Sequence, residues 1–189
     1  RTGYRMGNGQ IVDMMIHDGL WDPYNNVHMG NCGDRTSAEF GFTREQLDEF
    51  AAESYRRALG AVATLAEEIS PISVPQRKGD PVVVSQDEEP GRGNIAKLPD
   101  LRAAFAKDGV TTAGNASSIN DGGAALVISS AEWAAAHGKT AIGRIVGYAQ
   151  HAQEPEWFTT APAFAVQKLM DAHGLSVSDV DLFEVNEAF

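Results

Sequence analysis

The amino-acid sequence predicts an α/β layered architecture in its second half and an irregular α+β segment before it. The apolar run at residues 124–128 has the composition of a buried strand or a tightly packed helix, and residues 142–148 and 181–186 alternate as strands. Helical patterns at residues 129–137 and 162–173 separate these segments. Strands that alternate with helices favour helices packed against a sheet.

Length and composition are those of one ordinary globular domain or parts of two. The chain has 189 residues, of which 43% are hydrophobic and 22% are charged. Its apolar runs are far shorter than the roughly 20 residues that a membrane helix needs, so we expect no membrane span. The net charge of −11 argues against a nucleic-acid-binding surface. An anionic ligand would need local basic residues.

The single cysteine, Cys32, excludes a disulfide within the chain and suits a reducing compartment. It could be a nucleophile or a structural residue, and its sequence neighbours offer no base, which favours the structural role. The first residue is arginine and the last segment ends within a patterned stretch. We therefore expect the chain to be part of a longer protein, whose targeting signals this sequence would not display.

The first 42 residues are rich in glycine and predict mostly loops. A short regular element is expected at residues 11–16, and turns at Asp22-Pro23 and Asn25-Asn26 lead to His28 and Met29. His28 by itself could be catalytic or a hydrogen-bonded structural histidine.

A helix is predicted to begin after Thr43, because Gln46 completes a capping box with it. Apolar residues then recur at helical spacing, which predicts one buried face. Tyr55 lies on that face and is expected to be half-buried. The face comprises Leu47, Phe50, Ala51, Tyr55, Ala58, Leu59 and Val62.

Residues 70–106 predict two strands, an acidic loop and a short helix. Residues 72–74 and 82–84 read as strands on either side of a polar turn. The acidic loop at residues 87–91 precedes Arg92 and Lys97, which could bind a phosphate or pair with that loop. The helix is expected at residues 100–106, with Leu101 and Phe105 on its apolar side.

Residues 110–123 are small, polar and rich in glycine, so their backbone could approach a ligand closely. The stretch is either a binding loop or an ordinary loop before a core element. Beyond it, Ser129 and Glu132 predict a capping box for a helix that ends at Gly138.

Another helix is predicted from Pro162 to Gly174, with Phe164, Val166, Leu169 and Met170 on its apolar side. Asn186 follows the last predicted strand, at the kind of edge where α/β proteins bind ligands. Its amide could hold a water molecule or polarise a carbonyl, or it could simply end the strand.

Taken in order, these motifs resemble the thiolase family, in particular its short-chain acetyl-CoA acetyltransferases. The matching motifs lie at residues 18–30, 43–51, 112–122 and 186–189. The potassium-dependent mitochondrial-type group is most similar, since it shares Cys32, the strand at residues 82–84, and the motifs at residues 155–158 and 161–162. Two residues depart from that group: Gly114 stands where it has alanine and Thr159 where it has proline.

The resemblance implies a partial thiolase-like layered αβαβα fold with an irregular α+β loop domain. Residues 1–119 would form the CoA-binding loop domain, residues 120–139 a return segment of the N-terminal core domain, and residues 140–189 the start of the C-terminal core domain. Members of the family are dimers or tetramers. A bacterial cytoplasm or a mitochondrial matrix would be the compartment.

The implied activity is reversible condensation of two acetyl-CoA molecules to acetoacetyl-CoA and CoA through an acyl-cysteine. The nucleophilic cysteine, the histidine and the second cysteine of the family would lie outside this chain, so the chain alone is expected to be inactive. CoA would be substrate and product, with no other tightly bound cofactor except a potassium ion in the most similar group.

The resemblance also assigns residues. Asn186 would hold the water of an oxyanion hole. The carbonyls of Ala113, Gly114 and Ala116, together with Tyr55, would form the potassium site. Substrate or CoA contacts would come from Leu20, His28, Met29, Tyr55, Arg92, Lys97, Ser117, Phe158 and Phe189.

Two other functions stay open. One is a non-catalytic CoA-binding protein on a thiolase scaffold, which CoA binding without turnover would indicate. The other is a degradative 3-ketoacyl-CoA thiolase for longer chains, which a comparison of substrate lengths would separate from the short-chain enzyme.

Overall fold

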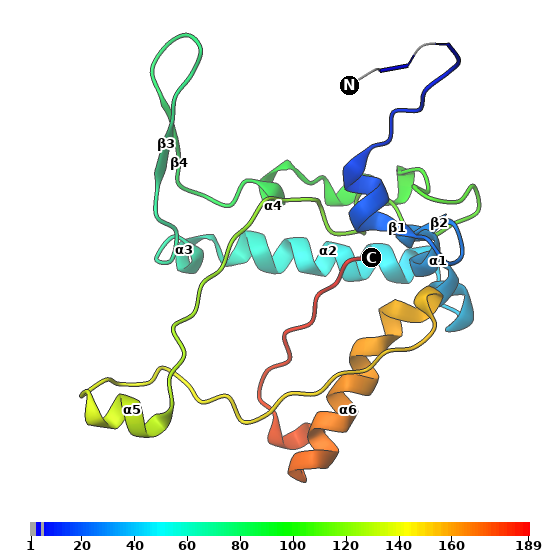
Figure 1. Ribbon diagram of the computed structural model, residues 1–189. Coiled ribbons are helices and arrows are strands. Elements are labelled where there is room, and N and C mark those ends of the chain that lie inside the picture. The colour runs from blue at the N-terminus through cyan, green and yellow to red at the C-terminus, as the bar shows by residue number, and fades with distance from the viewer. Residues whose placement is uncertain (1–2, 5) are drawn as a thin grey trace. The chain divides into compact units, whose positions relative to one another are not determined.

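The computed structural model describes residues 3–4 and 6–189, which form two compact units. The first unit comprises Arg1–Ser117 together with Glu187–Phe189, and the second comprises Ser118–Asn186. Figure 1 labels the helices and strands.

The first unit begins with a π-helical turn, η1 (Ile16–Leu20), followed by β1 (Trp21–Asp22) and β2 (Val27–His28), which pair antiparallel. The short element expected at residues 11–16 begins only at its end, since residues 11–13 have no regular structure. The predicted turn is confirmed at residues 23–26. There the buried Asp22 accepts a hydrogen bond from Tyr24 N at 2.9 Å.

Two longer helices follow, α1 (Met29–Glu39) and α2 (Arg44–Gly60), and α2 leads into the single turn of α3 (Val62–Leu65). The capping box is confirmed. Thr43 Oγ1 accepts a hydrogen bond from Gln46 N at 3.3 Å, and Gln46 Oε1 accepts one from Thr43 N at 2.8 Å. Both orphan amides at the start of α2 are thereby satisfied.

The buried face of α2 differs from the predicted stripe. The small core of this unit consists of Ala51, Ala52 and Leu98, with the half-buried Tyr55 packed against it as expected. Phe50 is 63% exposed, and Leu59 and Val62 are exposed as well. The reason is that the elements packed on α2 are short and cover only one narrow strip of it.

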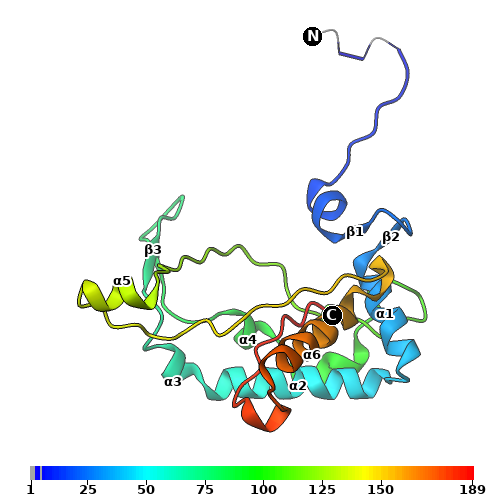
Figure 2. The same cartoon turned by 60° about the horizontal axis from the view of Figure 1, so that its bottom comes forward.

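The covering elements are α4 (Glu89–Arg92), which replaces part of the expected acidic loop, and the 3₁₀ helix η2 (Ile95–Asp100). Figure 2 shows them alongside α2 from a second direction. The alanines of α2 have little bulk, so η2 can approach closely enough to bury Leu98, which is 3% exposed.

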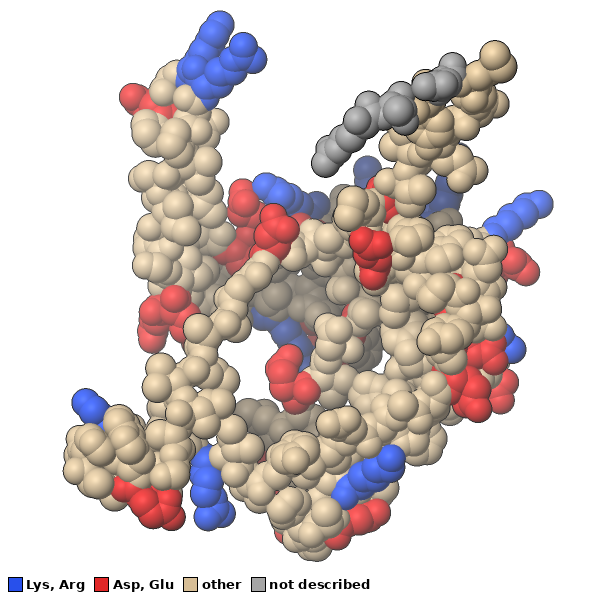
Figure 3. Space-filling view, in the orientation of Figure 1, with Lys and Arg blue, Asp and Glu red and all other residues tan. Residues whose placement is uncertain are grey.

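The predicted strands at residues 72–74 and 82–84 are confirmed as β3 (Ile72–Val74) and β4 (Val82–Val84), an antiparallel hairpin with Ser73 opposite Val83. Its tip carries Arg77 and Lys78, and Figure 3 shows basic side chains at that end of the hairpin.

The helix predicted at residues 100–106 is wrong. Asp100 is the last residue of η2, and the residues after it form no helix: Ala104 N donates to Thr111 O at 2.8 Å, and Ala103 forms a bridge with Thr112. Backbone pairing with residues 111–112 therefore replaces the hydrogen bonds that a helix would have made, a tertiary effect that local propensity does not report.

The second unit contains α5 (Ala131–Ala136), η3 (Pro155–Thr160), α6 (Ala161–His173) and η4 (Val177–Asp179). Both predicted helices are confirmed, and α6 ends at Gly174 with φ +61°, a conformation that favours glycine. The expected cap of α5 is wrong by one residue. Ser130, not Ser129, accepts the hydrogen bond from Trp133 N, at 3.1 Å.

The three strands predicted at residues 124–128, 142–148 and 181–186 are absent, because these segments have no regular structure in the described chain. Their side chains are exposed, with Val127 at 103% and Ile142 at 106%. A strand needs hydrogen-bonded neighbours, and the strands among the described residues belong to the two hairpins alone. The apolar side chains of these three segments are therefore left uncovered by the other elements of the described chain.

Within residues 3–4 and 6–189, no helix combines the length and the apolar character that crossing a membrane requires. The same residues hold no group of three or more His, Cys, Asp or Glu side chains placed to bind a metal ion.

Candidate functional site

The loop at residues 110–117 is a tight, well-anchored turn. Thr112 is fully buried, and its Oγ1 accepts hydrogen bonds from Gly114 N and Asn115 N, both at 3.2 Å. Ala116 N donates to Thr112 O at 3.1 Å. The threonine side chain thus satisfies the backbone of its own turn, which fixes the path toward Ser117.

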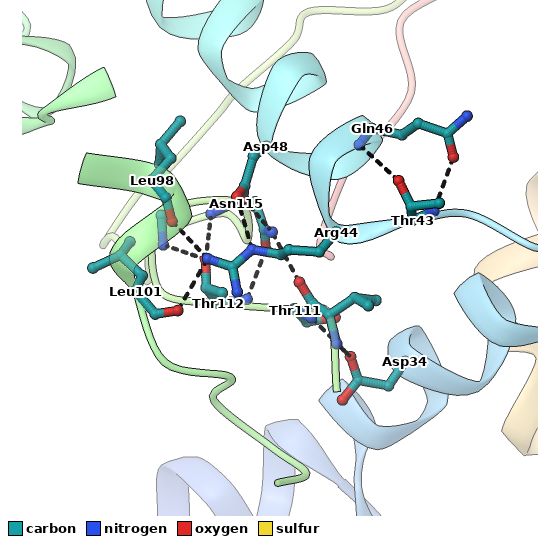
Figure 4. Close-up of polar contacts among 12 residues, drawn as sticks. Asp34, Thr43, Arg44, Gln46, Asp48, Leu98, Leu101, Thr111, Thr112 and Asn115 are labelled. Carbon is teal, nitrogen blue, oxygen red and sulfur yellow. Dashed lines mark hydrogen bonds and ion pairs between the residues drawn. The ribbon is translucent and has the colours of Figure 1, made fainter. Parts of the chain in front are cut away.

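Asn115 fixes the same turn to the rest of the unit (Figure 4). Its Oδ1 accepts a hydrogen bond from Thr112 N at 2.7 Å. Its Nδ2 donates to Val110 O and to Asp48 Oδ1, both at 3.0 Å. The side-chain amide therefore ties both ends of the turn to α2.

Asp48 is in turn held by Arg44 on the preceding turn of α2. Arg44 Nε lies 2.8 Å from Asp48 Oδ2, and Arg44 Nη2 donates to Leu98 O and Leu101 O at 2.5 and 3.0 Å. The Asp48 side chain is 8% exposed and that of Arg44 21%. This buried ion pair links α2, η2 and the loop, and removing either partner would leave the other charge uncompensated.

Asp34 on α1 holds the beginning of the loop. Its Oδ1 accepts hydrogen bonds from Val110 N at 3.0 Å and Thr111 N at 2.8 Å. Figure 4 shows Asp34 and the Arg44–Asp48 pair reaching the loop from two different helices.

Ser117 ends the loop with an exposed side chain. Its N and Oγ both donate to Ala188 O, at 3.4 and 3.2 Å. This contact brings the loop next to Phe189, the residue after Ala188, so two of the expected binding residues lie near each other.

His28 caps α1 and joins an aromatic cluster. Its Nδ1 accepts a hydrogen bond from Gly30 N at 3.0 Å, so the neutral ring carries its proton on Nε2. The ring stacks on Phe105 at 4.6 Å, and Phe105 meets Phe189 edge-on at 5.6 Å. Burial lowers the pKa of His28 from its ordinary value of 6.5. The side chain is therefore a neutral hydrogen-bond donor at neutral pH.

Leu20 and Met29 lie next to this cluster in the chain. β1 and β2 pair Trp21 with His28, so Leu20 and Met29 flank the paired residues from either side. Both side chains are half-buried.

Arg92 and Lys97 lie on the two short elements packed against α2, namely α4 and η2. The exposed Arg92 forms an ion pair with Glu88 at 2.9 Å, so the acidic loop does take up one of the two cations. Lys97 is exposed, and within the described chain no carboxylate lies at ion-pair distance from it.

Two of the residues assigned to potassium, Tyr55 and Gly114, lie next to Leu98. Tyr55 packs against the core that contains Leu98, and a Cβ added to Gly114 would lie 2.5 Å from both Leu98 Cδ2 and Leu101 Cδ1. The two leucines thus occupy the space that a side chain at position 114 would need. Among the described hydrogen bonds, none is accepted by the carbonyls of Ala113, Gly114 or Ala116. These oxygens are available to a hard cation, which prefers such ligands.

Phe158 and Asn186 belong to the second unit. Phe158 is half-buried in η3, a turn held by Gln153, whose Nε2 donates to Trp157 O and to Thr160 Oγ1, the latter at 2.7 Å. Asn186 is exposed.

Several residues that build this site were not predicted from the sequence: Asp34, Arg44, Asp48, Phe105 and Asn115. Asp48 offered one usable signal, because it is a charged residue directly beside the apolar positions of an amphipathic helix. Arg44 and Asn115 also had local signals, since Arg44 pairs with Asp48 four residues later and Asn115 bonds to Thr112 and Val110. Asp34 and Phe105 have partners that are distant in sequence.

Two family models match the chain: "Thiolase, N-terminal domain" over residues 1–132 and "Thiolase, C-terminal domain" over residues 139–189. The acetyl-CoA acetyltransferase of Yarrowia lipolytica is 47% identical over 189 residues, which are 99% of this chain and 47% of that protein. The acetyl-CoA acetyltransferase of Pseudomonas aeruginosa is 45% identical over 192 residues, which cover 100% of this chain and 49% of that protein.

Solved structures show the same likeness. The Acat5 thiolase of Ascaris suum in complex with coenzyme A is 42% identical with a TM-score of 0.90, and the match covers 100% of this chain and 49% of that one. The acetyl-CoA acetyltransferase of Bacillus anthracis is 38% identical with a TM-score of 0.89, over 100% and 48%. The chain thus spans about half the length of the relatives it matches.

Proposed function

The chain belongs to the thiolase family and has part of the thiolase fold, and from this premise we propose that its complete gene product is an acetyl-CoA acetyltransferase. A cysteine thiolate attacks the thioester carbonyl of one acetyl-CoA and CoA leaves as the thiol. The deprotonated methyl group of a second acetyl-CoA then attacks the acyl-cysteine, which yields acetoacetyl-CoA and regenerates the thiolate. The groups that form and break these bonds lie outside this chain.

The observation that carries the proposal is the loop at residues 110–117. Its backbone is fixed by Asp34, Asp48 and Asn115, while Ser117 at its end remains exposed. Such a preorganised loop can bind the pantetheine arm of CoA without a further loss of conformational entropy. Its small residues let that arm lie close to the backbone.

The aromatic cluster beside the loop would contact the same ligand. His28 presents Nε2–H as a neutral donor, and Leu20, Met29 and Phe189 offer apolar surface. Phe158 would add an apolar wall near the acyl group. Large side chains around the acyl group would leave it little room, which favours a short group such as acetyl or acetoacetyl.

Asn186 would take the catalytic role among the residues of this chain. A side-chain amide that holds a water molecule at the carbonyl oxygen stabilises the negative charge that develops there. Asn186→Ala should therefore slow turnover more than it weakens binding of CoA.

Arg92 and Lys97 would bind the phosphates at the nucleotide end of CoA. The chain as a whole is acidic, so such a site depends on local cations. Lys97 is the stronger candidate, because Arg92 already interacts with Glu88.

A potassium ion would bind to the carbonyl oxygens of Ala113, Gly114 and Ala116 and to Tyr55, and would stiffen the loop further. The availability of these carbonyls supports the assignment. Equal concentrations of KCl and NaCl should then give different rates of thiolysis, and Tyr55→Phe should reduce that difference.

The complete protein would act as a homodimer or homotetramer in a reducing compartment, with a place in fatty-acid metabolism. Large apolar side chains such as Leu126 and Val127 are exposed here and need cover from further chain or from other subunits.

One observation favours a second function, a non-catalytic CoA-binding protein. Cys32, the single cysteine, is 2% exposed and so is not presented to a substrate. Incubation of the complete gene product with acetoacetyl-CoA and CoA separates the two functions. Formation of acetyl-CoA supports the acetyltransferase, whereas CoA binding measured by calorimetry without any turnover supports the binding protein.

A further inference from the structure

Asp34 connects two segments of the first unit that carry expected CoA contacts, the one with His28 and the one with Ser117. It lies on α1, which begins directly after His28, and its Oδ1 accepts hydrogen bonds from Val110 N at 3.0 Å and Thr111 N at 2.8 Å. Those two amides open the loop that ends at Ser117. One carboxylate therefore fixes the start of the loop relative to the helix that bears His28.

The close approach of this carboxylate depends on Gly109. A Cβ added there would lie 2.3 Å from Asp34 Oδ2 and 2.8 Å from its Cγ. The φ of Gly109 lies outside the left-handed region, so alanine would suit the backbone. Glycine is therefore needed at this position for the space that it leaves to Asp34.

Asp34 contacts the loop through one carboxylate oxygen. Among the described residues, Asp34 Oδ2 and Thr111 Oγ1 are buried and have no hydrogen-bond partner, and Thr111 is 1% exposed. Both contacts of Asp34 with the loop are therefore made by Oδ1.

We propose that Asp34 is a positioning residue of the CoA site, which sets the distance between His28 and Ser117 by binding the amides of Val110 and Thr111. This inference rests on the proposed function. Hydrogen bonds from two amides to a charged oxygen are stronger than bonds to a neutral acceptor. Without them the amides of Val110 and Thr111 lose their acceptor and the start of the loop can shift away from α1, although Asn115 still bonds to Val110 O. Binding of CoA should then weaken more than turnover slows.

The test uses the complete gene product and a double-mutant cycle of Asp34→Ala with Gly109→Ala. Each single variant should raise the Kd for CoA roughly tenfold, in line with the loss of hydrogen bonds to a charged group. The double variant should have the same Kd for CoA as Asp34→Ala. Once the carboxylate of Asp34 has been removed, the Cβ of an alanine at position 109 has no carboxylate left to displace. Gly60→Ala is the matched control, since a Cβ at that position meets nothing within 4 Å.

Calorimetry gives the Kd, steady-state kinetics give KM and kcat separately, and hydrogen exchange reports the amides of Val110 and Thr111. Asp34→Asn keeps the shape of the side chain and one acceptor oxygen, so its Kd for CoA should lie between those of the wild type and Asp34→Ala. This variant also keeps the test valid if Asp34→Ala does not fold. The expected result is faster exchange at both amides and a higher KM with a nearly unchanged kcat.

Two results would overturn the inference. The first is unchanged CoA affinity in Asp34→Asn and Gly109→Ala while the wild type binds CoA, which would contradict the role of Asp34 alone. The second is additive losses in the double variant, which would mean that Gly109 acts independently of the carboxylate. A wild-type protein that binds no CoA would instead overturn the proposed function, and this inference with it.

Discussion

Asn115 Nδ2 donates a 3.0 Å hydrogen bond to Asp48 Oδ1 across 67 residues of sequence. The other oxygen of Asp48 binds Arg44 Nε at 2.8 Å. Through this one carboxylate the loop that ends at Ser117 is fixed to α2, and α2 is fixed to η2 through the carbonyl contacts of Arg44. The position of the exposed Ser117 thus depends on polar contacts among Asn115, Asp48 and Arg44.

Asn115→Ala is expected to loosen this loop. The substitution removes the acceptor for the amide of the buried Thr112 and the donors to Val110 and Asp48. The free energy of local opening should fall by about 2 kcal/mol, the usual effect of leaving buried groups unsatisfied. Hydrogen exchange at the amide of Thr112 measures it in the complete gene product.

The matched control is Asn120→Ala, since the exposed Asn120 side chain bonds only to Ser118 nearby in sequence. It should leave exchange at Thr112 unchanged. Equal exchange rates in the two variants would contradict the role assigned to Asn115.

His28 should make the first unit less stable in mild acid. Burial lowers its pKa below 6.5, so the folded state binds the proton less readily than the unfolded state does. Neutral His28 therefore contributes fully to the free energy of unfolding above pH of about 6.5. This contribution is lost as the pH falls through that value toward the pKa of His28 in the folded state. Protonation at Nδ1 would also remove the acceptor for Gly30 N.

The measurement compares the melting temperature of the wild type and of His28→Gln between pH 5 and 8, a range chosen around the ordinary histidine pKa. The wild type should lose more stability toward the acid end than His28→Gln. His17→Gln is the control: the exposed His17 pairs with the exposed Asp18 at 2.7 Å, and because such surface pairs contribute little, this variant should follow the wild type. Parallel curves for the wild type and His28→Gln would refute the prediction.

Lys97→Ala should weaken the binding of CoA but not of a truncated pantetheine thioester that lacks the nucleotide. The loss should be a few-fold, because an exposed ion pair contributes about 1 kcal/mol or less. Lys107→Ala changes another exposed lysine, on the loop before Gly109, and is the control. Equal losses for CoA and for the truncated compound would place Lys97 away from the nucleotide end.

Local features of the fold could be predicted from the sequence. The capping box of Thr43 and Gln46, the hairpin at residues 72–84 and the end of α6 at Gly174 depend on residues close in sequence, and all are confirmed. The cap of α5 was predicted one residue too early. Ser129 and Ser130 have the same side chain, so the pattern could not tell which of them accepts the capping hydrogen bond.

Features that depend on distant partners could not be predicted. Residues 100–106 contain good helix formers, yet Ala104 N donates to Thr111 O and residues 101–106 form no helix. The contacts of Asp34 and Asn115 likewise join parts of the chain more than 60 residues apart, which leave no periodic signal. The apolar segments at residues 124–128, 142–148 and 181–186 were predicted as strands from their patterns, but strands also require neighbours.

The residues of the site also divide into those that sequence motifs revealed and those whose role depends on distant partners. His28, Ser117 and Phe189 were found through motifs, and the structure brings them together within one unit through Phe105 and Ala188. Their roles toward CoA remain predictions. Asp48 and Asn115 lie within the motifs at residues 43–51 and 112–122, but their part in holding that arrangement, like that of Asp34, depends on partners distant in sequence.

The most direct test of the account is thiolysis by the complete gene product, with acetoacetyl-CoA compared to 3-ketooctanoyl-CoA in the presence of CoA. We expect acetyl-CoA to form from acetoacetyl-CoA, and kcat/KM to be higher for this short substrate than for the longer one. A correctly folded protein that binds CoA but forms no acetyl-CoA from acetoacetyl-CoA would contradict the central claim.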